Sequence, residues 1–441
     1  MADSDLSDPD LHRLMWRLGL PAMAGLSLNA LHQAVDAAFV GRLGADALAA
    51  LVVLAPLAGL VAAAGIGLGI GAASATARSL GAKRPDQARA VAGVSMTAAL
   101  VLAVCAVGGL WTFGEGVLHL LGAQGELRAT AQPYLVIQAL TIGCAILQIL
   151  CDFLAIGRGN ATFSLKTLGF CFGLNILLDP VFIFGLNLGL AGAAWATLCA
   201  QIVTLCVWAW HFHTPHRRPT LGPLRLLGPV LRVGLPEAAA VAVTTISLMA
   251  LLRLATTSGG ADEVAALGIA LRLVFVVMLP LEGFAIGVQP ILSHAHGSAN
   301  AARFAATLRR ILYMCGAITA ALSILFSMGA RPLVRLFVVD PAIVTQAAGM
   351  LSYLALSLPA IALRLCAQIS LQATVQPRMA TLLGLAPMGW LLWPSMALLV
   401  PLFGPVGIAL SVLVAAWLAA FLALVPIRAA LFTLSPNGAS V

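Results

Sequence analysis

Charged side chains are scarce in this chain of 441 residues. Lys and Arg number 24 and Asp and Glu number 16, so charged residues make up 9% of the chain, against about 25% in soluble proteins. Hydrophobic residues make up 61%, which excludes a disordered chain. Because so little charge cannot cover a water-soluble domain of this size, we exclude a soluble globular enzyme. We expect an all-α polytopic membrane protein, since a β-barrel would alternate apolar and polar residues.

Signals for metal, nucleotide and disulfide chemistry are also missing. The eight Cys all fall within apolar runs and lack CxxC spacing, so we interpret them as small buried hydrophobic residues. No GxxxxGKS/T loop is present to support ATP hydrolysis. The net charge of +8 comes largely from basic residues in short loops, so we expect no nucleic-acid partner. We therefore predict a protein that is not an enzyme and that carries neither a cofactor nor a structural metal.

Apolar runs predict twelve membrane spans, each long enough to cross a bilayer with about 20 residues. We place them at about 14–40, 47–77, 89–112, 130–156, 163–185, 189–211, 230–256, 263–293, 303–328, 343–373, 379–401 and 405–432. Basic residues gather in cytoplasmic loops, and a cytoplasmic N-terminus puts 17 of the 24 Lys and Arg on the inner side. We therefore expect a multi-pass protein of the inner (plasma) membrane with both termini cytoplasmic.

An internal repeat relates the two halves of the chain. Gly19-Leu20-Pro21 recurs as Gly234-Leu235-Pro236, and ADALAAL at 45–51 recurs as ADEVAAL at 261–267 in nearly the same register. Chance matching among helices rich in Ala, Gly and Leu is the alternative explanation. A true repeat of six spans would relate the halves by a pseudo-two-fold axis along the membrane normal, with substrate bound between them.

The longest polar connection separates these halves. Residues 212–229 contain several prolines and a cluster of basic residues, which indicates a linker. We therefore predict an N-terminal lobe at 1–211, a cytoplasmic linker at 212–229 and a C-terminal lobe at 230–441.

Three segments resemble the multidrug and toxin extrusion (MATE) transporters. GLPAMAGLSLNALHQAVDAAFVGRLGADALAAL at 19–51 is similar to the first helix and loop of that family. AIGRGNATFS at 155–164 and LNILLDPVFIFGLNLGLAGAAWATLCAQ at 174–201 are similar to its fourth-to-sixth helix region. The resemblance covers nearly the whole chain. An Asp in the first span, an Asn and an Asp in the fifth, and no acidic pair in the second half resemble its DinF-like branch.

The resemblance implies twelve transmembrane helices in two six-helix lobes, V-shaped around a central cavity. It also implies a monomeric multidrug antiporter that exports small amphiphilic drugs or toxic cations by alternating access, driven by H⁺ or Na⁺, with H⁺ favoured. A lipid-linked oligosaccharide flippase of the same superfamily is the alternative. It would need a strongly cationic cavity for pyrophosphate, and only Arg253, Arg272 and Arg364 are available. A channel is a third hypothesis.

Two acidic residues within the spans carry the functional prediction, because charge inside a membrane costs about 2.5–3.5 kcal/mol on insertion scales. Asp36 lies near the outer end of the first span, and His32 and Asn29 share its helix face. Asp179 lies toward the outer end of the fifth span, one turn after Asn175. Both spans run from inside to outside, so we expect the two carboxyl groups at similar depth.

Neighbouring carboxyl groups in a low-dielectric interior can share one proton, which suits a group that takes up a proton outside and releases it inside. Their oxygens, with that of Asn175, would also suit Na⁺. The resemblance implies this cation role for Asp36, Asn175, Asp179 and Thr197. The alternative is that both acids are partly hydrated helix caps. His32 is either a proton partner of Asp36 or an ordinary histidine between helices.

Other polar residues within the spans are less specific. Asp152 is either a proton step toward the inside or a structural group. Pro21 would kink the first span, and the resemblance implies bending there on protonation of Asp36, while a proline that does not move is the alternative. Glu237 is expected at the inner interface, and the sequence identifies no partner for Glu282 or Arg364. The weakest prediction is the cavity lining, for which we name Met249, Phe275, Met278, Gln289, Gln368 and Trp390.

Overall fold

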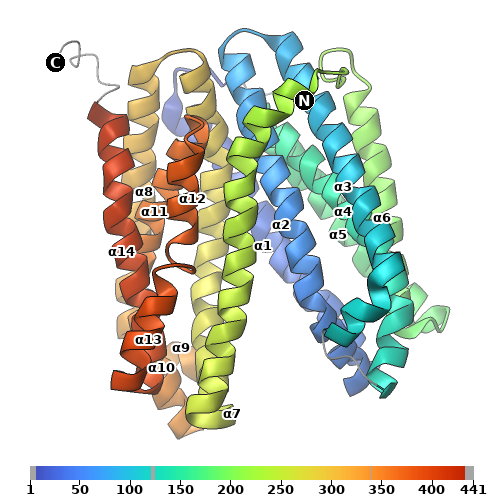
Figure 1. Cartoon of the computed structure of the whole chain (residues 1–441), viewed down its shortest axis with the longest axis vertical. Helices are drawn as coiled ribbons and strands as arrows, with labels where there is room; N and C mark the ends of the chain where they lie inside the picture. The colour runs from blue at the N-terminus through green and yellow to red at the C-terminus, as the bar shows by residue number, and fades with distance from the viewer. Residues whose placement is uncertain (1–5, 121–124, 339, 433–441) are drawn as a thin grey trace.

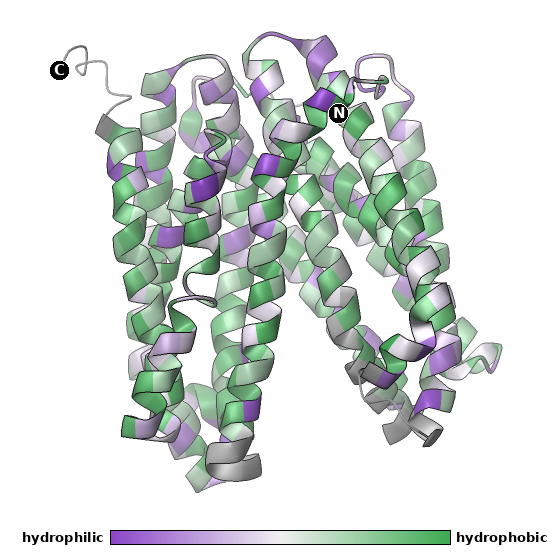
Figure 2. Ribbon diagram, in the orientation of Figure 1, coloured by the Kyte–Doolittle hydropathy of each residue, from purple (hydrophilic) through white to green (hydrophobic). Residues whose placement is uncertain are grey.

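The protein is a bundle of long helices, seen here in a computed structural model that describes residues 6–120, 125–338 and 340–432 (Figure 1). The helices are α1 (Leu11–Gly41), α2 (Ala45–Gly81), α3 (Pro85–Leu120), α4 (Gly125–Gly157), α5 (Ala161–Pro180), α6 (Gly189–Phe212), α7 (Leu227–Gly297), α8 (Ala301–Met328), α9 (Ala330–Arg335), α10 (Pro341–Ala355), α11 (Leu358–Ala373), α12 (Pro377–Leu385), α13 (Leu392–Phe403) and α14 (Pro405–Phe432). These described residues contain no strand, which agrees with the predicted all-α class. Apolar residues run along most of the helices (Figure 2).

Nine segments of the described residues are long and apolar enough to cross a membrane. Two of them, Leu224–Ala255 and Glu263–Gly297, belong to α7. Val230 and His294 lie against Gly71 and Gly81 of α2, although a straight helix would hold them roughly 95 Å apart. The helix therefore folds back on itself, and its two arms are separate spans. With α1, α2 and the interrupted α12–α13 segment, the described chain makes the twelve passes predicted for it.

Two predicted spans are interrupted in the structure. The span at 343–373 is divided into α10 and α11 by Leu356 and Ser357. Pro359 follows in the first turn of α11, where a missing backbone N–H costs nothing. The span at 379–401 is divided by residues 386–391, which include Pro387 and Gly389. Apolar composition alone could not reveal these breaks, because both segments are hydrophobic throughout.

The two lobes meet at one end of the bundle, the closed end, where α2 packs against both arms of α7. A Cβ added at Gly71 would lie 2.2 Å from the carbonyl oxygen of Val230, and one at Gly67 would lie 2.5 Å from that of Gly234. Gly81 and Gly297 make equally close approaches in this contact. Glycine is required at these positions, because only a residue without a side chain lets the backbone of a neighbouring helix approach so closely.

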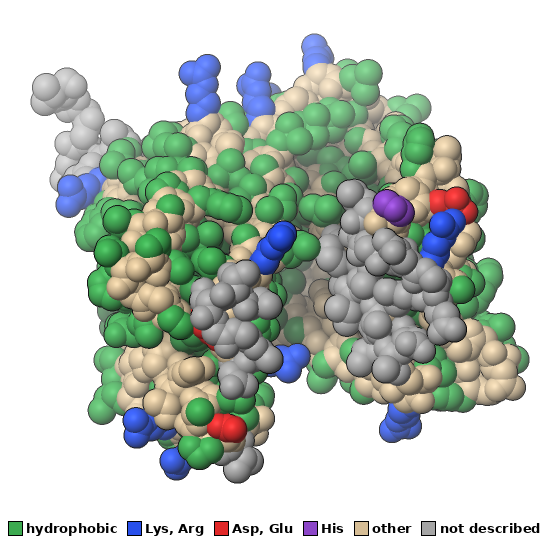
Figure 3. All heavy atoms as spheres, turned by 60° about the horizontal axis from the view of Figure 1, so that its bottom comes forward, with side chains coloured by type: hydrophobic (Ala, Val, Ile, Leu, Met, Phe, Trp, Pro, Cys, Tyr) green, Lys and Arg blue, Asp and Glu red, His purple; other side chains and the backbone are tan. Residues whose placement is uncertain are grey.

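The lobes separate toward the opposite end, which we call the open end. In Figure 1 the helices of the two lobes diverge toward the bottom of the view. The space-filling view from that side shows a hollow between the lobes (Figure 3). Gly41, Gly44 and Gly59 of the N-terminal lobe lie toward this end, and each faces open space. The molecule is thus V-shaped and open on one side, as the resemblance implied.

The first helix of each lobe begins against the opposite lobe. Leu14 and Leu18 of α1 belong to the hydrophobic core of the C-terminal lobe, and Gly19 lies under the ring of Phe284. Val230 of α7 belongs to the core of the N-terminal lobe. The repeated Gly-Leu-Pro sequences follow these contacts in α1 and α7. Each repeat therefore begins with a helix that packs first against the opposite lobe, which gives the repeat a structural role.

The predicted linker lies against the N-terminal lobe. The backbone N–H of Thr220 donates to the carbonyl of Arg89 at 3.1 Å, and the Arg89 guanidinium donates to the carbonyl of Pro215 at 3.0 Å. Gly93 of α3 accommodates the carbonyl of Thr220, which a Cβ would approach to 2.0 Å. The linker is therefore held on α3, while the exact lobe boundaries at 211 and 230 stay a prediction.

Substituting Gly71 by Ala is expected to destabilise the closed end, because the new methyl group would overlap the carbonyl of Val230. Overpacking of this kind costs about 1–3 kcal/mol. Gly108→Ala in α3 is the matched control, since a Cβ there meets nothing within 4 Å. We expect a lower midpoint of thermal unfolding in detergent for Gly71→Ala only, measured by size-exclusion chromatography after heating. Equal midpoints for the two variants would contradict the packing described.

Candidate functional site

The candidate site lies in the N-terminal lobe, where α1 packs against α5. Asp10 caps the start of α1, and its side chain accepts from the N–H of Arg13 at 3.1 Å. On the same helix, Nδ1 of His32 lies 3.5 Å from Oδ1 of Asp36. The imidazole of His32 is buried and stacks on the ring of Phe172 in α5, with ring centroids 4.3 Å apart. The predicted His32–Asp36 face is therefore turned toward α5.

Local turn chemistry places α5 and α6 beside α1. Asn160 caps α5 by accepting from the N–H of Phe163 at 3.3 Å, directly after Gly159 with a φ of +80°. At the other end, Pro180 leads into a π-helical turn at Val181–Gly185. Asn187 and Gly189 adopt positive φ angles in the connection that follows. These features reverse the chain so that α6 runs back alongside α5.

Asn175 joins the two acids, because its amide nitrogen lies between them. It donates to Oδ1 of Asp36 at 3.0 Å and to Oδ2 of Asp179 at 3.3 Å. Its amide oxygen faces Thr197 on α6, from which it accepts through the hydroxyl at 3.1 Å and the backbone N–H at 3.2 Å. The amide is assigned this way because each of its atoms then faces a suitable partner. The structure thus brings together four residues that the sequence placed in one site.

The carboxyl groups of Asp36 and Asp179 are neighbours, because both contact the same amide nitrogen, and they interact electrostatically with each other. Asp179 and Asn175 are each 1% exposed, and Asp36 is half-buried. No Lys or Arg forms an ion pair with either acid among the described residues. Because two carboxylates repel each other in such surroundings, the contact is favourable when one of them carries a proton.

Tyr134 is a member of this environment that the sequence did not indicate. It lies on α4, is buried, and interacts electrostatically with both acids. The sequence signal was weak, because Tyr134 is a single polar side chain at the start of a long apolar run. Asn29, by contrast, shares the face of Asp36 but makes no hydrogen bond among the described residues. Pro21 lies about four turns closer to the closed end.

Asp152 belongs to a separate polar cluster nearer the closed end. Its carboxyl group accepts from the Ser164 hydroxyl at 2.8 Å and from the Thr167 hydroxyl at 3.4 Å. All three side chains are buried between α4 and α5. This geometry ties the start of α5 to α4, which is the structural role considered for Asp152.

The six residues named for the cavity lining differ in their exposure. Gln289 and Gln368 are buried in a polar network of the C-terminal lobe, and Met278 is buried in its apolar core. Met249, Phe275 and Trp390 are exposed, and the Trp390 indole donates to the carbonyl of Leu382. Three of the six are therefore buried and three exposed, and their place in the cavity lining stays a prediction.

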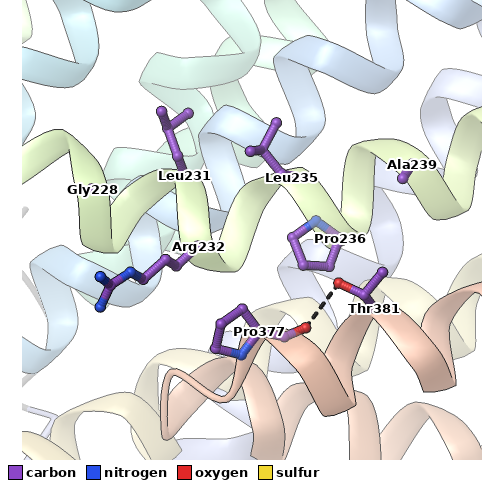
Figure 4. Close-up of a pocket in the computed structure, with 8 residues that line it drawn as sticks. All are labelled: Gly228, Leu231, Arg232, Leu235, Pro236, Ala239, Pro377 and Thr381. Atoms are coloured by element: carbon purple, nitrogen blue, oxygen red, sulfur yellow. Dashed lines mark hydrogen bonds between the residues drawn. The ribbon is translucent and has the colours of Figure 1, made fainter.

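A groove of about 540 Å³ lies on the other lobe, between the first arm of α7 and α12 (Figure 4). Its lining is mostly apolar, with Leu231, Leu235 and Pro236 on α7 and Pro377 on α12. Arg232 extends along its edge (Figure 4). None of the acidic residues described above lines it.

The oxygen-rich N-terminal site can hold a proton or a small hard cation. The described residues contain no group of three or more His, Cys, Asp and Glu arranged to bind a metal ion. The site offers two carboxyl groups, one amide and one hydroxyl, which are ligands for H⁺ or Na⁺ rather than for a transition metal.

Asn175→Leu is expected to destabilise the protein, because both carboxyl groups lose their shared donor in a buried position. Leaving a buried polar group without a partner costs about 1–3 kcal/mol. Asn29→Leu is the matched control, since Asn29 lies on the same face without a hydrogen bond. The thermal midpoint in detergent should fall for Asn175→Leu and stay near wild type for Asn29→Leu. The reverse order would show that the amide does not hold the site together.

Comparison with known proteins extends over almost the whole chain. It is 27% identical over 428 residues to the multidrug export protein MepA of Staphylococcus haemolyticus (strain JCSC1435), covering 95% of this chain and 93% of that protein. It is 26% identical over 420 residues to MepA of Staphylococcus aureus (strain NCTC 8325 / PS 47), covering 93% and 92%.

Solved structures share the fold. A multidrug resistance MATE family transporter in an outward-facing conformation superposes with a TM-score of 0.90 at 24% identity, covering 98% of this chain and 99% of that one. A MATE crystal structure in a bent conformation gives a TM-score of 0.91 at 24% identity, with 97% of each chain covered. The MatE family model matches residues 21–181 and 236–390, one segment in each lobe. The chain therefore belongs to the MatE family of membrane transporters.

Proposed function

We propose that this protein is a cation-coupled multidrug antiporter that exports amphiphilic, often cationic compounds. The observation that carries the proposal is the pair of Asp36 and Asp179, which share the amide of Asn175 without a Lys or Arg ion pair among the described residues. Membership of the MatE family and relatives named multidrug export protein support transport of drugs. A carboxyl pair of this kind supplies a site for the coupling ion.

The coupling ion that this geometry favours is H⁺. In the orientation assigned to the Asn175 amide its nitrogen faces both Asp36 and Asp179, whereas a sodium ion between the carboxyl groups would need the amide oxygen there. A proton needs only the two carboxyl oxygens that already lie close together. Rotation of the Asn175 amide would present its oxygen instead, and this is the route by which Na⁺ could bind. No further cofactor is needed for either ion.

The closed end is proposed to face the cytoplasm and the open end the outside of the inner membrane. Arg78, Arg89 and Arg303 lie at the closed end, as the positive-inside rule requires of a cytoplasmic surface. In this orientation both termini are cytoplasmic, and the cleft between the lobes opens outward. Alternating access would then require the glycine contacts at the closed end to separate, so that a monomer can load drug from inside.

The distribution of charged residues bears on two questions. One is whether the protein has the DinF-like arrangement, and the other is whether it is a drug exporter or a flippase. The N-terminal lobe contains the acidic pair Asp36 and Asp179. The acids of the C-terminal lobe, Glu237 and Glu282, do not lie at the equivalent positions of the repeat, which supports a DinF-like arrangement. A flippase would need a cationic cavity for pyrophosphate. Arg364 interacts electrostatically with both Glu237 and Glu282, so its positive charge is offset by two acids. This charge balance favours the drug exporter.

Neutralising either acid of the pair is expected to abolish coupled transport. Asp36→Asn and Asp179→Asn should each reduce the efflux of a cationic dye from proteoliposomes by at least tenfold, because the variant site cannot alternate between charged and neutral forms. Dye efflux would be recorded under an imposed pH gradient and, separately, under a Na⁺ gradient. The wild type should respond to the pH gradient.

The matched control is Glu115→Gln, which removes an exposed carboxylate paired with Arg128 and lying at the open end. It should transport dye like the wild type. Wild-type efflux in both Asp variants would refute the proposal. A wild type that responds only to Na⁺ would assign the other coupling ion while leaving the site in place.

A further inference from the structure

The groove between the first arm of α7 and α12, which we call the α7–α12 groove, faces the bilayer. It lies within the apolar span Leu224–Ala255, and Leu235 in its wall is 61% exposed. Because the lobes are in contact at this end, an exposed apolar side chain here faces lipid and not the cleft. From Gly228 to Ala239 the groove follows α7 for about 16 Å, close to the roughly 15 Å of hydrocarbon in one leaflet. The groove therefore has the length and surface to hold an acyl chain.

Arg232 brings a positive charge without a partner into this apolar lining. Its side chain is exposed and makes no hydrogen bond or ion pair with any residue that the structure describes. No acid is among the described residues that line the groove, and the Thr381 hydroxyl already donates to the carbonyl of Pro377 at 2.8 Å (Figure 4). The guanidinium thus keeps its N–H donors for an acceptor from outside the chain, and a phosphate can take two of them at once.

The positive charge lies toward one end of the groove. Arg232 comes one turn after Gly228, at the end of the groove nearest the closed end, and extends from α7 on the side of α12 (Figure 4). An arginine side chain can keep its stem among apolar groups while its head reaches the membrane surface. Arg378, next to Pro377 at the start of α12, adds a second exposed positive charge. The groove is therefore complementary to an amphiphile whose head is an anion.

We propose that the α7–α12 groove binds an anionic phospholipid from the leaflet at the closed end. One acyl chain lies along Leu231 and Leu235, and Arg232 donates to the phosphate. A zwitterionic lipid has the same phosphate, but the lining offers no described acid to pair with its ammonium group. A cationic drug fits less well, because Arg232 repels its charge. This lipid site depends neither on the proposed export function nor on the coupling ion.

Both walls of the groove belong to elements that hold the closed end together. On α7, the carbonyls of Val230 and Gly234 lie against glycines of α2. Beside α12, the backbone carbonyl of Gln372 in the last turn of α11 accepts from the hydroxyl of Ser74 on α2 at 3.2 Å. A lipid held between α7 and α12 would fix these two elements relative to each other. Its binding should therefore stabilise the arrangement in which the closed end is shut.

The test measures the affinity of the purified full-length protein for dioleoyl phosphatidylglycerol by native mass spectrometry, with dioleoyl phosphatidylcholine as the zwitterionic comparison. We expect the wild type to bind its first phosphatidylglycerol more tightly than its first phosphatidylcholine. Arg232→Gln should weaken the first phosphatidylglycerol about fivefold and change phosphatidylcholine little, because one basic side chain near an anionic head contributes about that factor. Gly228→Leu should weaken both lipids, since a Cβ at Gly228 meets nothing within 4 Å and the new side chain would fill part of the groove.

Arg310→Gln on α8 is the matched control, because Arg310 is also exposed and does not line the groove. It should leave both affinities unchanged. Equal weakening by Arg232→Gln and Arg310→Gln would reduce the effect to general attraction between lipid and a basic surface, and would overturn the proposal. So would displacement of the lipid by an equal concentration of glycerol phosphate, which lacks acyl chains.

Two further outcomes distinguish a lipid from a drug and test the link to the closed end. Displacement of phosphatidylglycerol by the lipophilic cation tetraphenylphosphonium, lost in Gly228→Leu, would assign the groove to drug and overturn the proposal. Phosphatidylglycerol should raise the thermal midpoint of the wild type in detergent more than that of Arg232→Gln. Equal midpoint shifts in the two proteins would contradict a stabilising lipid at Arg232.

Discussion

The amide of Asn175 between the carboxyl groups of Asp36 and Asp179 is the interaction on which the functional account depends. An apolar lobe gives these acids little solvation, and no Lys or Arg pairs with them in the described structure. The pair is therefore most stable when it holds a proton, and losing that proton leaves repulsion that one amide cannot offset. Because Asp36 is on α1 and Asp179 is on α5, any change of charge there acts on the packing of these two helices.

The position of α1 extends that local effect to the contact between the lobes. Its C-terminal half carries Asp36 into the N-terminal lobe, while Leu14 and Leu18 near its start lie in the core of the C-terminal lobe. Pro21 lies between the two regions, where a helix lacks one backbone hydrogen bond and bends most readily. The same helix thus carries Asp36 of the acidic pair toward one end and contacts the closed end at the other. The close glycine contacts of α2 with α7 complete this closed end.

Much of the fold could be predicted because twelve long apolar runs allow few alternatives in a bilayer. The site could be predicted in part, since helical spacing placed His32 and Asp36 on one face, and parallel spans placed Asp179 at the same depth. The breaks at Leu356 and near Gly389 could not be predicted, because apolar composition continues through them. Tyr134 was missed for the same reason. The two partners of Arg364, Glu237 and Glu282, lie on different arms of α7 and far from it in the sequence, so only the folded chain could reveal them.

Proton release on drug binding is the measurement that tests the central claim most directly. Tetraphenylphosphonium would be added to purified protein in weakly buffered detergent solution with a soluble pH indicator, near the pH at which transport is fastest. The account predicts that the wild type releases protons as the drug binds and that Asp36→Asn releases far fewer at the same occupancy. Equal release from both proteins, or none from the wild type, would contradict a shared proton at Asp36 and Asp179.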